Sequence, residues 1–166
     1  VYALDHNQNH YLAWYRKEVT LPPAWKGQRV FIRVGSANYT AKIWVNGKEI
    51  GSHEGGHLPF VLEVTKALFW NKANVIAIAV ENKPLPERVP AGPTPSGGLL
   101  SGPFAGFPTT TYDFFPYAGL HRAVQLFTVP QVHIEDLTVV TGIEGKDGTV
   151  SVTIKTTQDA KGTVQL

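Results

Sequence analysis

The pattern of apolar and polar positions predicts β-strands along most of the chain. β-Branched apolar residues occupy every second position in Arg29–Val34, and small or β-branched apolar residues do so in Ala41–Asn46. A period of two is typical of a strand with one face against a core, because successive side chains point to opposite faces. Asn46–Gly47 tolerates the positive φ angles of a type I′ turn. We therefore expect a hairpin in which Ile43–Asn46 folds back onto Lys48–Ser52.

Further segments rich in β-branched and aromatic residues predict more strands. They are Tyr11–Val19, Phe60–Val64, Val75–Val80, Leu120–Val129, His133–Thr141 and an alternating run through Val150, Val152 and Ile154. The uninterrupted apolar run Val75–Val80 indicates a central strand buried on both faces. Thr65–Leu68 suits one helical turn, and no segment shows helical spacing over the roughly ten to twelve residues that a stable helix needs. The predicted fold class is all-β.

A long segment, Lys83–Thr111, interrupts the strand pattern. It holds seven of the twelve prolines and five glycines, with almost no alternation. Structureless loops longer than about 12 to 15 residues are uncommon inside compact domains, and they are usually functional or mobile. We expect a long loop here, and its length is itself an indication of function.

The predicted strands fall into two units. Residues 1–130 hold the larger one, and a second begins near Gln131, after Pro130. Residues 131–166 have room for two full strands and a short piece at Thr163–Leu166. That is fewer than the three strands that independent stability requires. We therefore expect the second unit to be truncated.

Composition and charge narrow the classes of partner. Of the 166 residues, 43% are hydrophobic and 17% are charged, which is typical of folded globular proteins. A net charge of +2 is too small and too scattered for a nucleic-acid or anionic-membrane binder. No apolar run approaches the roughly 20 residues that span a bilayer. Without cysteine there is neither a disulfide framework nor a thiolate metal site, so the cellular location stays open.

Three stretches resemble, in order and spacing, the amino-terminal domain of family-two glycoside hydrolases: Ile43–Gly47 (IWVNG), His53–Phe60 (HEGGHLPF) and Tyr117–Arg122 (YAGLHR). Within that family, Thr111–Arg122 (TYDFFPYAGLHR) is most similar to the β-glucuronidases, in which an Asp-Phe-Phe-Asn-Tyr-Ala-Gly run is familiar. Pro116 stands here in place of the Asn. The likeness covers Tyr11–Thr141 and fades beyond it.

The resemblance implies a jelly-roll β-sandwich (residues 1–130), then the first strands of an immunoglobulin-like sandwich (residues 131–166). Beyond these it implies a (β/α)₈ barrel with two catalytic glutamates, which is absent from this sequence. The resemblance implies a glucuronide-type carbohydrate as the partner, bound by this chain together with that barrel. It implies no cofactor, and it is compatible with a homo-oligomeric parent. The alternatives are a β-galactosidase- or mannosidase-like parent, an independent carbohydrate-binding module, and a domain that only packs and oligomerises.

The thirteen acidic residues offer no obvious pair of carboxyl groups for glycoside hydrolysis. A retaining glycosidase needs two of them about 5 to 5.5 Å apart. Glu135 and Asp136 are neighbours on a predicted strand and should point to opposite faces as solvated charges. The family's acid/base glutamate belongs to an Asn-Glu dipeptide, which this chain lacks. We expect no catalytic residue here, and no hydrolysis by this chain alone.

Asp113 is the candidate substrate-binding residue. It lies at the exit of the long loop, in the stretch most similar to the β-glucuronidases. The resemblance implies that its carboxylate reaches into the barrel's pocket and bonds the sugar. The local chemistry fits equally well an aspartate that caps the turn into Phe114–Phe115.

For His121–Arg122 we favour a structural role, since an arginine in a strand often pairs with an acid or stacks on an aromatic ring.

Two other patterns have a structural interpretation beside a functional one. His53–His57 matches the letters of the zinc-protease helix motif, but two glycines and Pro59 disfavour a helix. We therefore expect a loop or strand end there, with a tight backbone crossing and no metal.

The tryptophans suit a sugar-stacking platform, yet burial in the core is favoured because tryptophan side chains bury large areas. Trp44 is the exception, being opposite in phase to Ile43 and Val45. The four are Trp14, Trp25, Trp44 and Trp70.

Overall fold

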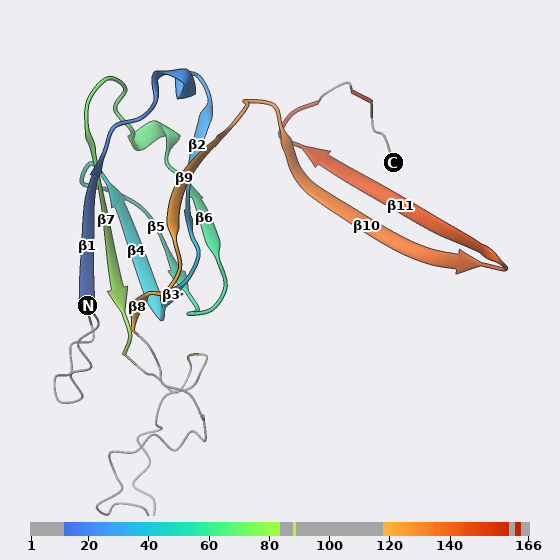
Figure 1. Ribbon diagram of the computed structural model, residues 1–166, viewed down its shortest axis with the longest axis horizontal. Coiled ribbons are helices and arrows are strands. Elements are labelled where there is room, and N and C mark those ends of the chain that lie inside the picture. The colour runs from blue at the N-terminus through green and yellow to red at the C-terminus, as the bar shows by residue number, and fades with distance from the viewer. Residues whose placement is uncertain (1–11, 84–87, 89–117, 160–161, 164–166) are drawn as a thin grey trace, which may run out of the picture.

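Two antiparallel sheets face each other in the computed structural model, which describes residues 12–83, 88, 118–159 and 162–163 (Figure 1). The four-stranded sheet has the order β1-β7-β4-β5, and the three-stranded sheet has the order β6-β2-β9. The bounds in the first sheet are β1 (Leu12–Val19), β7 (Asn74–Glu81), β4 (Thr40–Val45) and β5 (Lys48–Glu54). Those in the second are β6 (Phe60–Glu63), β2 (Arg29–Val34) and β9 (Val124–Val129).

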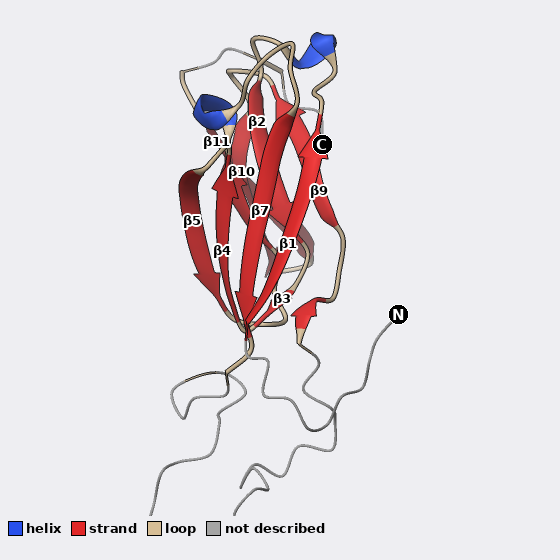
Figure 2. Ribbon diagram, turned by 90° about the vertical axis from the view of Figure 1, so that its left-hand side faces the viewer, coloured by secondary structure: helices blue, strands red, loops and turns tan. Residues whose placement is uncertain are grey.

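Two short strands, β3 (Ala37–Asn38) and β8 (Gly119–Leu120), pair with each other at one end of the sandwich. The helical content of the described ranges is two single turns, η1 (Pro23–Trp25) and η2 (Thr65–Ala67) (Figure 2). The prediction of an all-β chain is confirmed, and the two facing sheets are those of a jelly-roll-type β-sandwich. No helix in the described part of the chain is long or apolar enough to cross a membrane.

The core lies between the two sheets and follows the period-two pattern. Every second residue of β2 and of β4 is fully buried, and β7 supplies the central row opposite β2. The residues from these three strands are Val30, Ile32, Val34, Ala41, Ile43, Val45, Ile76, Ile78 and Val80. Burial of apolar area at roughly 25 cal/mol per Å² makes this row the main stabilising feature of the sandwich.

The predicted β4–β5 hairpin is confirmed. Asn46 and Gly47 have φ angles of 53° and 82°, as a type I′ turn requires. The Asn46 side chain also holds the neighbouring strand, because its Oδ1 accepts a hydrogen bond from the Val75 amide at 2.9 Å. Its Nδ2 donates to the Ala67 carbonyl at 2.8 Å, which fixes η2 against the same end.

Two details of the predicted strands were wrong. Leu120–Val129 is not one strand: Gly119–Leu120 (β8) pairs with β3, the chain turns at residues 121–123, and β9 then joins the other sheet. Val75–Val80 is central in its sheet but is not buried on both faces, since Val75 and Ala77 are half-buried. Val75 and Ala77 lie on the face of β7 that points away from the core. An apolar run in the sequence does not show whether that second face is buried in another core or only partly covered.

A separate hairpin follows the sandwich and consists of β10 (Ile134–Glu144) and β11 (Asp147–Thr156) (Figure 1). Glu135 is the extra residue of a β-bulge in β10, and its carboxylate pairs with Lys155 at 3.0 Å. Asp136 accepts a hydrogen bond from the Thr138 hydroxyl. Both acids are exposed, so their interpretation as solvated strand charges is confirmed.

An ion pair on the three-stranded sheet makes the stability of the chain depend on pH. The Arg29 guanidinium donates two hydrogen bonds to the Glu63 carboxylate, at 2.7 and 3.3 Å, and the Thr65 hydroxyl donates a third. The bonds from Arg29 are the main reason that the pKa of Glu63 lies below its usual value of 4.5.

A group whose pKa is lowered by folding adds stability above its unfolded pKa and loses it as pH falls through the folded value. We therefore expect the free energy of unfolding to decrease below about pH 4.5, and to decrease less in Glu63→Gln. Urea titrations between neutral pH and about pH 3 measure this. Glu18→Gln, at the more exposed pair with Arg16, is the control. Equal pH dependence in all three proteins would contradict the assignment.

Candidate functional site

The end of the sandwich that carries β3 and β8 is built from main-chain hydrogen bonds between distant segments. The Tyr39 amide donates to the Glu81 carbonyl at 2.8 Å, and the Gly55 amide donates to the Tyr39 carbonyl at 3.0 Å. The Ser36 hydroxyl donates to the Gly56 carbonyl. These bonds tie β3 to the ends of β5 and β7, so this end is a fixed platform.

Buried polar side chains and a close backbone approach characterise this platform. Ser36 and Asn38 are both 2% exposed. A Cβ atom on Gly56 would overlap the Asn38 side chain, so only glycine fits there. Within residues 55–59 the chain passes from β5 in one sheet to β6 in the other, so the predicted tight crossing between sheets at these glycines is confirmed. His53 and Glu54 are the last residues of β5, and so the segment is a strand end and not a helix.

The His53 ring stacks on Phe60, with ring centroids 4.3 Å apart, and the fold uses it as an aromatic packing residue. No group of three or more His, Asp or Glu side chains within the described ranges could hold a metal ion.

Asp113 lies outside the described residues, and its two interpretations stay predictions. The described chain resumes at Ala118, and β8 begins at Gly119, six positions after Asp113. β8 is held to the platform by its pairing with Asn38 and Ala37. The stretch that carries Asp113 therefore leads directly into this end of the sandwich.

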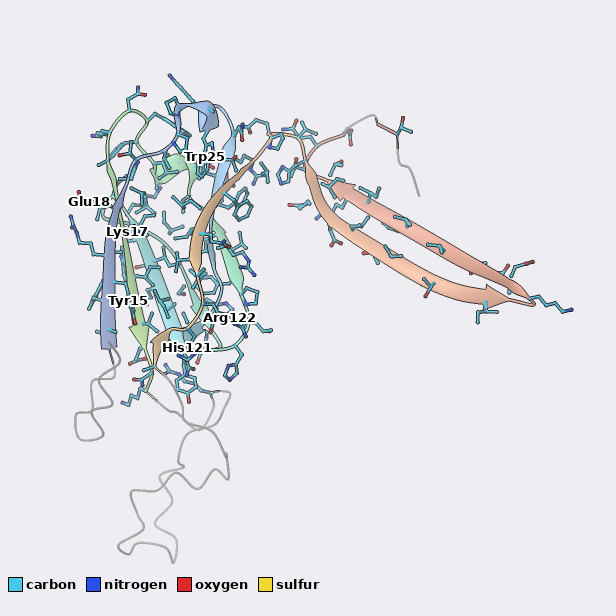
Figure 3. All side chains as sticks on the ribbon, viewed as in Figure 1. Tyr15, Lys17, Glu18, Trp25, His121 and Arg122 are labelled. Atoms are coloured by element: carbon cyan, nitrogen blue, oxygen red, sulfur yellow. The ribbon has the colours of Figure 1, made fainter. Side chains whose placement is uncertain are left out.

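His121 and Arg122 are exposed and lie next to the platform (Figure 3). The His121 amide donates to the Ser36 carbonyl at 3.2 Å. The Arg122 guanidinium donates to the His57 carbonyl at 3.1 Å. These contacts join the residues after β8 to the segment that follows β5, which is what a structural role requires.

Arg88 is a residue that reasoning from the sequence missed. Its guanidinium donates to Glu54 at 3.1 Å and to Glu81 at 2.9 Å, and it also bonds the Lys83 carbonyl. The side chain is 9% exposed. It therefore cross-links the ends of β5 and β7 where the chain leaves the sandwich. The available signal was an arginine inside a proline-rich segment, which does not by itself indicate a partner.

A groove of about 720 Å³ lies between the edge strands β1 and β9. Core residues such as Ile76, Ile78 and Leu126 form its wall. Residues 14–17 of β1 line it too, and of these Tyr15 and Lys17 share the core-side face with their register partners Ile78 and Ile76. The Tyr15 hydroxyl accepts a hydrogen bond from the Leu120 amide at 3.3 Å. A sugar needs many hydrogen-bond partners, and this mainly apolar wall suits it poorly.

The favoured burial of the tryptophans is wrong for Trp14, which is 61% exposed on β1. Its ring contacts Trp44, with centroids 5.2 Å apart and an interplanar angle of 33°. Trp44 is half-buried, and Trp25 and Trp70 are partly buried against the core. Trp14 faces outward because the even-numbered residues at the start of β1 point away from the second sheet. Which residues of β1 face the core is decided by its pairing with β7 and not by its own sequence.

Residues 4–130 match the family described as glycosyl hydrolases family 2, sugar binding domain. The chain belongs to this family. The resemblance found in the sequence is therefore confirmed, and the match covers the whole of both sandwich sheets.

Among the relatives of this family-2 domain, the β-glucuronidase of Canis lupus familiaris is 41% identical over 150 residues, covering 85% of the chain and 23% of the relative. That of Paenibacillus borealis is 35% identical, covering 87% and 24%. The solved β-glucuronidase of Faecalibacterium prausnitzii superposes with a TM-score of 0.77 at 37% identity, covering 91% of the chain and 27% of that structure. The chain thus spans about a quarter of the length of these proteins.

Proposed function

We propose that this chain is the non-catalytic sugar-binding domain of a β-glucuronidase-type glycosidase. The observation that carries the proposal is the family match over residues 4–130, together with 35 to 41% identity to β-glucuronidases along nearly the whole chain. Those relatives are about four times as long, so the glycosidic bond is cleaved by a catalytic domain that these residues do not include.

In this proposal residues 1–130 form the jelly-roll domain, and residues 131–166 are the first strands of an immunoglobulin-like domain. The described residues support the division, because the β10–β11 hairpin pairs only with itself among them. The exposed apolar side chains of the hairpin, such as Leu137, Val139 and Ile143, need a covering partner. Further strands of the same domain would supply it.

The domain contributes to the substrate cleft through Asp113. The support is its position in the sequence, six residues before a strand that is hydrogen-bonded into the rigid β3–β8 platform. A carboxylate held by a fixed support is suited to accepting hydrogen bonds from sugar hydroxyls in one orientation, which lowers the entropic cost of binding. Arg88 and Arg122 strengthen the support by cross-linking the segments around it.

The hydrolysis of aryl glycosides tests this proposal. We expect the 166-residue chain to cleave none of the 4-nitrophenyl β-glucuronide, β-galactoside and β-mannoside, because no suitable pair of carboxylates can be identified in it. A longer polypeptide that carries these residues and a catalytic domain is expected to cleave the glucuronide preferentially.

Preference for the galactoside or mannoside would overturn the glucuronidase part of the proposal. Turnover by the short chain that a single acid-to-amide substitution abolishes would overturn the non-catalytic part.

A further inference from the structure

The outer face of the four-stranded sheet carries an aromatic and cationic patch that the proposed function does not use. Register partners on neighbouring strands share a face, so the pairing of β1, β7 and β4 places its residues. Arg16, Ala77 and Trp44 form one row across the three strands, and Trp14, Ala79 and Lys42 form the next. We call these six residues the Trp14–Trp44 face.

The two rows give the face a defined geometry. The tryptophans occupy one diagonal and their rings meet above the alanines of β7, with centroids 5.2 Å apart. Arg16 and Lys42 occupy the other diagonal. Because neighbouring strands lie about 4.8 Å apart, β1 and β4 are separated by about 10 Å, and the two rings bridge this distance above Ala79, which is 6% exposed. An extended ligand can therefore reach both rings and both cations.

We propose that the Trp14–Trp44 face binds an acidic oligosaccharide, one that contains uronate rings. The apolar face of a pyranose stacks on the 61%-exposed Trp14 ring, and a carboxylate meets Lys42 or Arg16. Lys42 is exposed, and Arg16, whose Nη2 bonds Glu18, has further donors. The proposal does not depend on the proposed function, since it involves neither Asp113 nor the β3–β8 platform.

The composition of the face favours a sugar over a protein partner. Protein interfaces are enriched in aromatic residues and arginine but depleted of lysine and alanine, and this face holds Lys42, Ala77 and Ala79 beside its two tryptophans. On the Trp14–Trp44 face the cations Arg16 and Lys42 lie at two corners, each beside a tryptophan, and Leu12 and Trp14 are the strongly exposed large apolar residues on this side of the sheet among the described residues. Isolated aromatic rings with charged neighbours suit a ligand that has apolar ring faces and a polar, negatively charged edge.

Binding to the 166-residue chain tests the proposal without any catalysis. The probes are a hexasaccharide of alternating glucuronate and N-acetylglucosamine and, for comparison, neutral cellohexaose, followed by calorimetry and tryptophan fluorescence. We expect saturable binding of the acidic probe, weaker binding of the neutral one, and a decrease in affinity at higher salt. Trp14→Ala is expected to weaken binding of the acidic probe roughly tenfold or more, which is about 1.4 kcal/mol. Lys42→Gln is expected to weaken binding of the acidic probe but not of the neutral one.

Two variants make the result interpretable. Trp14→Phe retains a ring and should keep most of the affinity, which guards against a simple folding defect in Trp14→Ala. Lys17→Gln removes a cation from the opposite face of the same strand, where Lys17 is the register partner of the core residue Ile76, and should bind as the parent does. Absence of saturable binding, unchanged binding by Trp14→Ala, or equal affinity for the neutral probe would each overturn the proposal. Trp14 becoming protected only inside a longer polypeptide, with no sugar bound, would show instead that the face packs on another domain.

Discussion

Replacing Asp113 by alanine in a longer glycosidase that contains this chain is expected to lower kcat/KM roughly ten- to hundredfold. The reason is that a hydrogen bond from a sugar hydroxyl to a charged carboxylate contributes about 1.5 to 3 kcal/mol, and this contribution is lost from the transition state. Steady-state kinetics with 4-nitrophenyl β-glucuronide measure the effect. An aspartate that only caps a turn predicts the opposite result, in which the melting temperature falls by several degrees and the kinetics stay normal.

The control is Asp136→Ala, which makes the same chemical change at an exposed position of the β10–β11 hairpin, where the carboxylate accepts a hydrogen bond from the Thr138 hydroxyl. That variant should keep the parent's kinetic constants. Thermal unfolding of both variants separates a loss of binding from a loss of folded protein. Constants within about twofold of the parent for Asp113→Ala would remove Asp113 from the site and leave the domain a scaffolding role.

The largest expected effect on stability comes from Gly119→Ala. Gly119 has a φ angle of 90°, and a Cβ atom there would overlap the Tyr15 hydroxyl oxygen, which itself accepts the Leu120 amide bond. The left-handed backbone costs an alanine roughly 1 to 2 kcal/mol, and the overlap adds about 1 to 3 kcal/mol. Urea unfolding of the 166-residue chain should therefore show a loss of about 2 to 5 kcal/mol, a large part of the stability of a small domain.

Two variants separate the backbone cost from the overlap. Gly47→Ala also adopts a positive φ, 82°, but its Cβ would meet nothing within 4 Å, so it should show the backbone cost alone. Tyr15→Phe removes the hydroxyl that Gly119→Ala would strike. In the double variant Tyr15→Phe/Gly119→Ala, the free energy of unfolding that the overlap removes should be regained. The coupling energy between the two sites should be close to that amount. Additive effects of the two substitutions would show that β8 does not pack against Tyr15.

The sequence by itself determined most of the strands, the β4–β5 hairpin and the family of this chain. Alternation in β2 and β4 identified the core rows, because a strand with one buried face must repeat every two residues. Asn46–Gly47 identified the turn, because few residue pairs tolerate two positive φ angles in succession. These features are local, so a few neighbouring residues contain all the information needed.

Only the tertiary structure decided the features that depend on strand pairing. The direction of Trp14, the split of residues 119–129 between two sheets, and the contact of Gly119 with Tyr15 are each fixed by segments far apart in the chain. The same holds for Arg88, whose partners Glu54 and Glu81 come from two different strands. An alternating segment has the same sequence pattern whichever sheet it joins, so its phase toward core or solvent is settled only when its neighbours are in place.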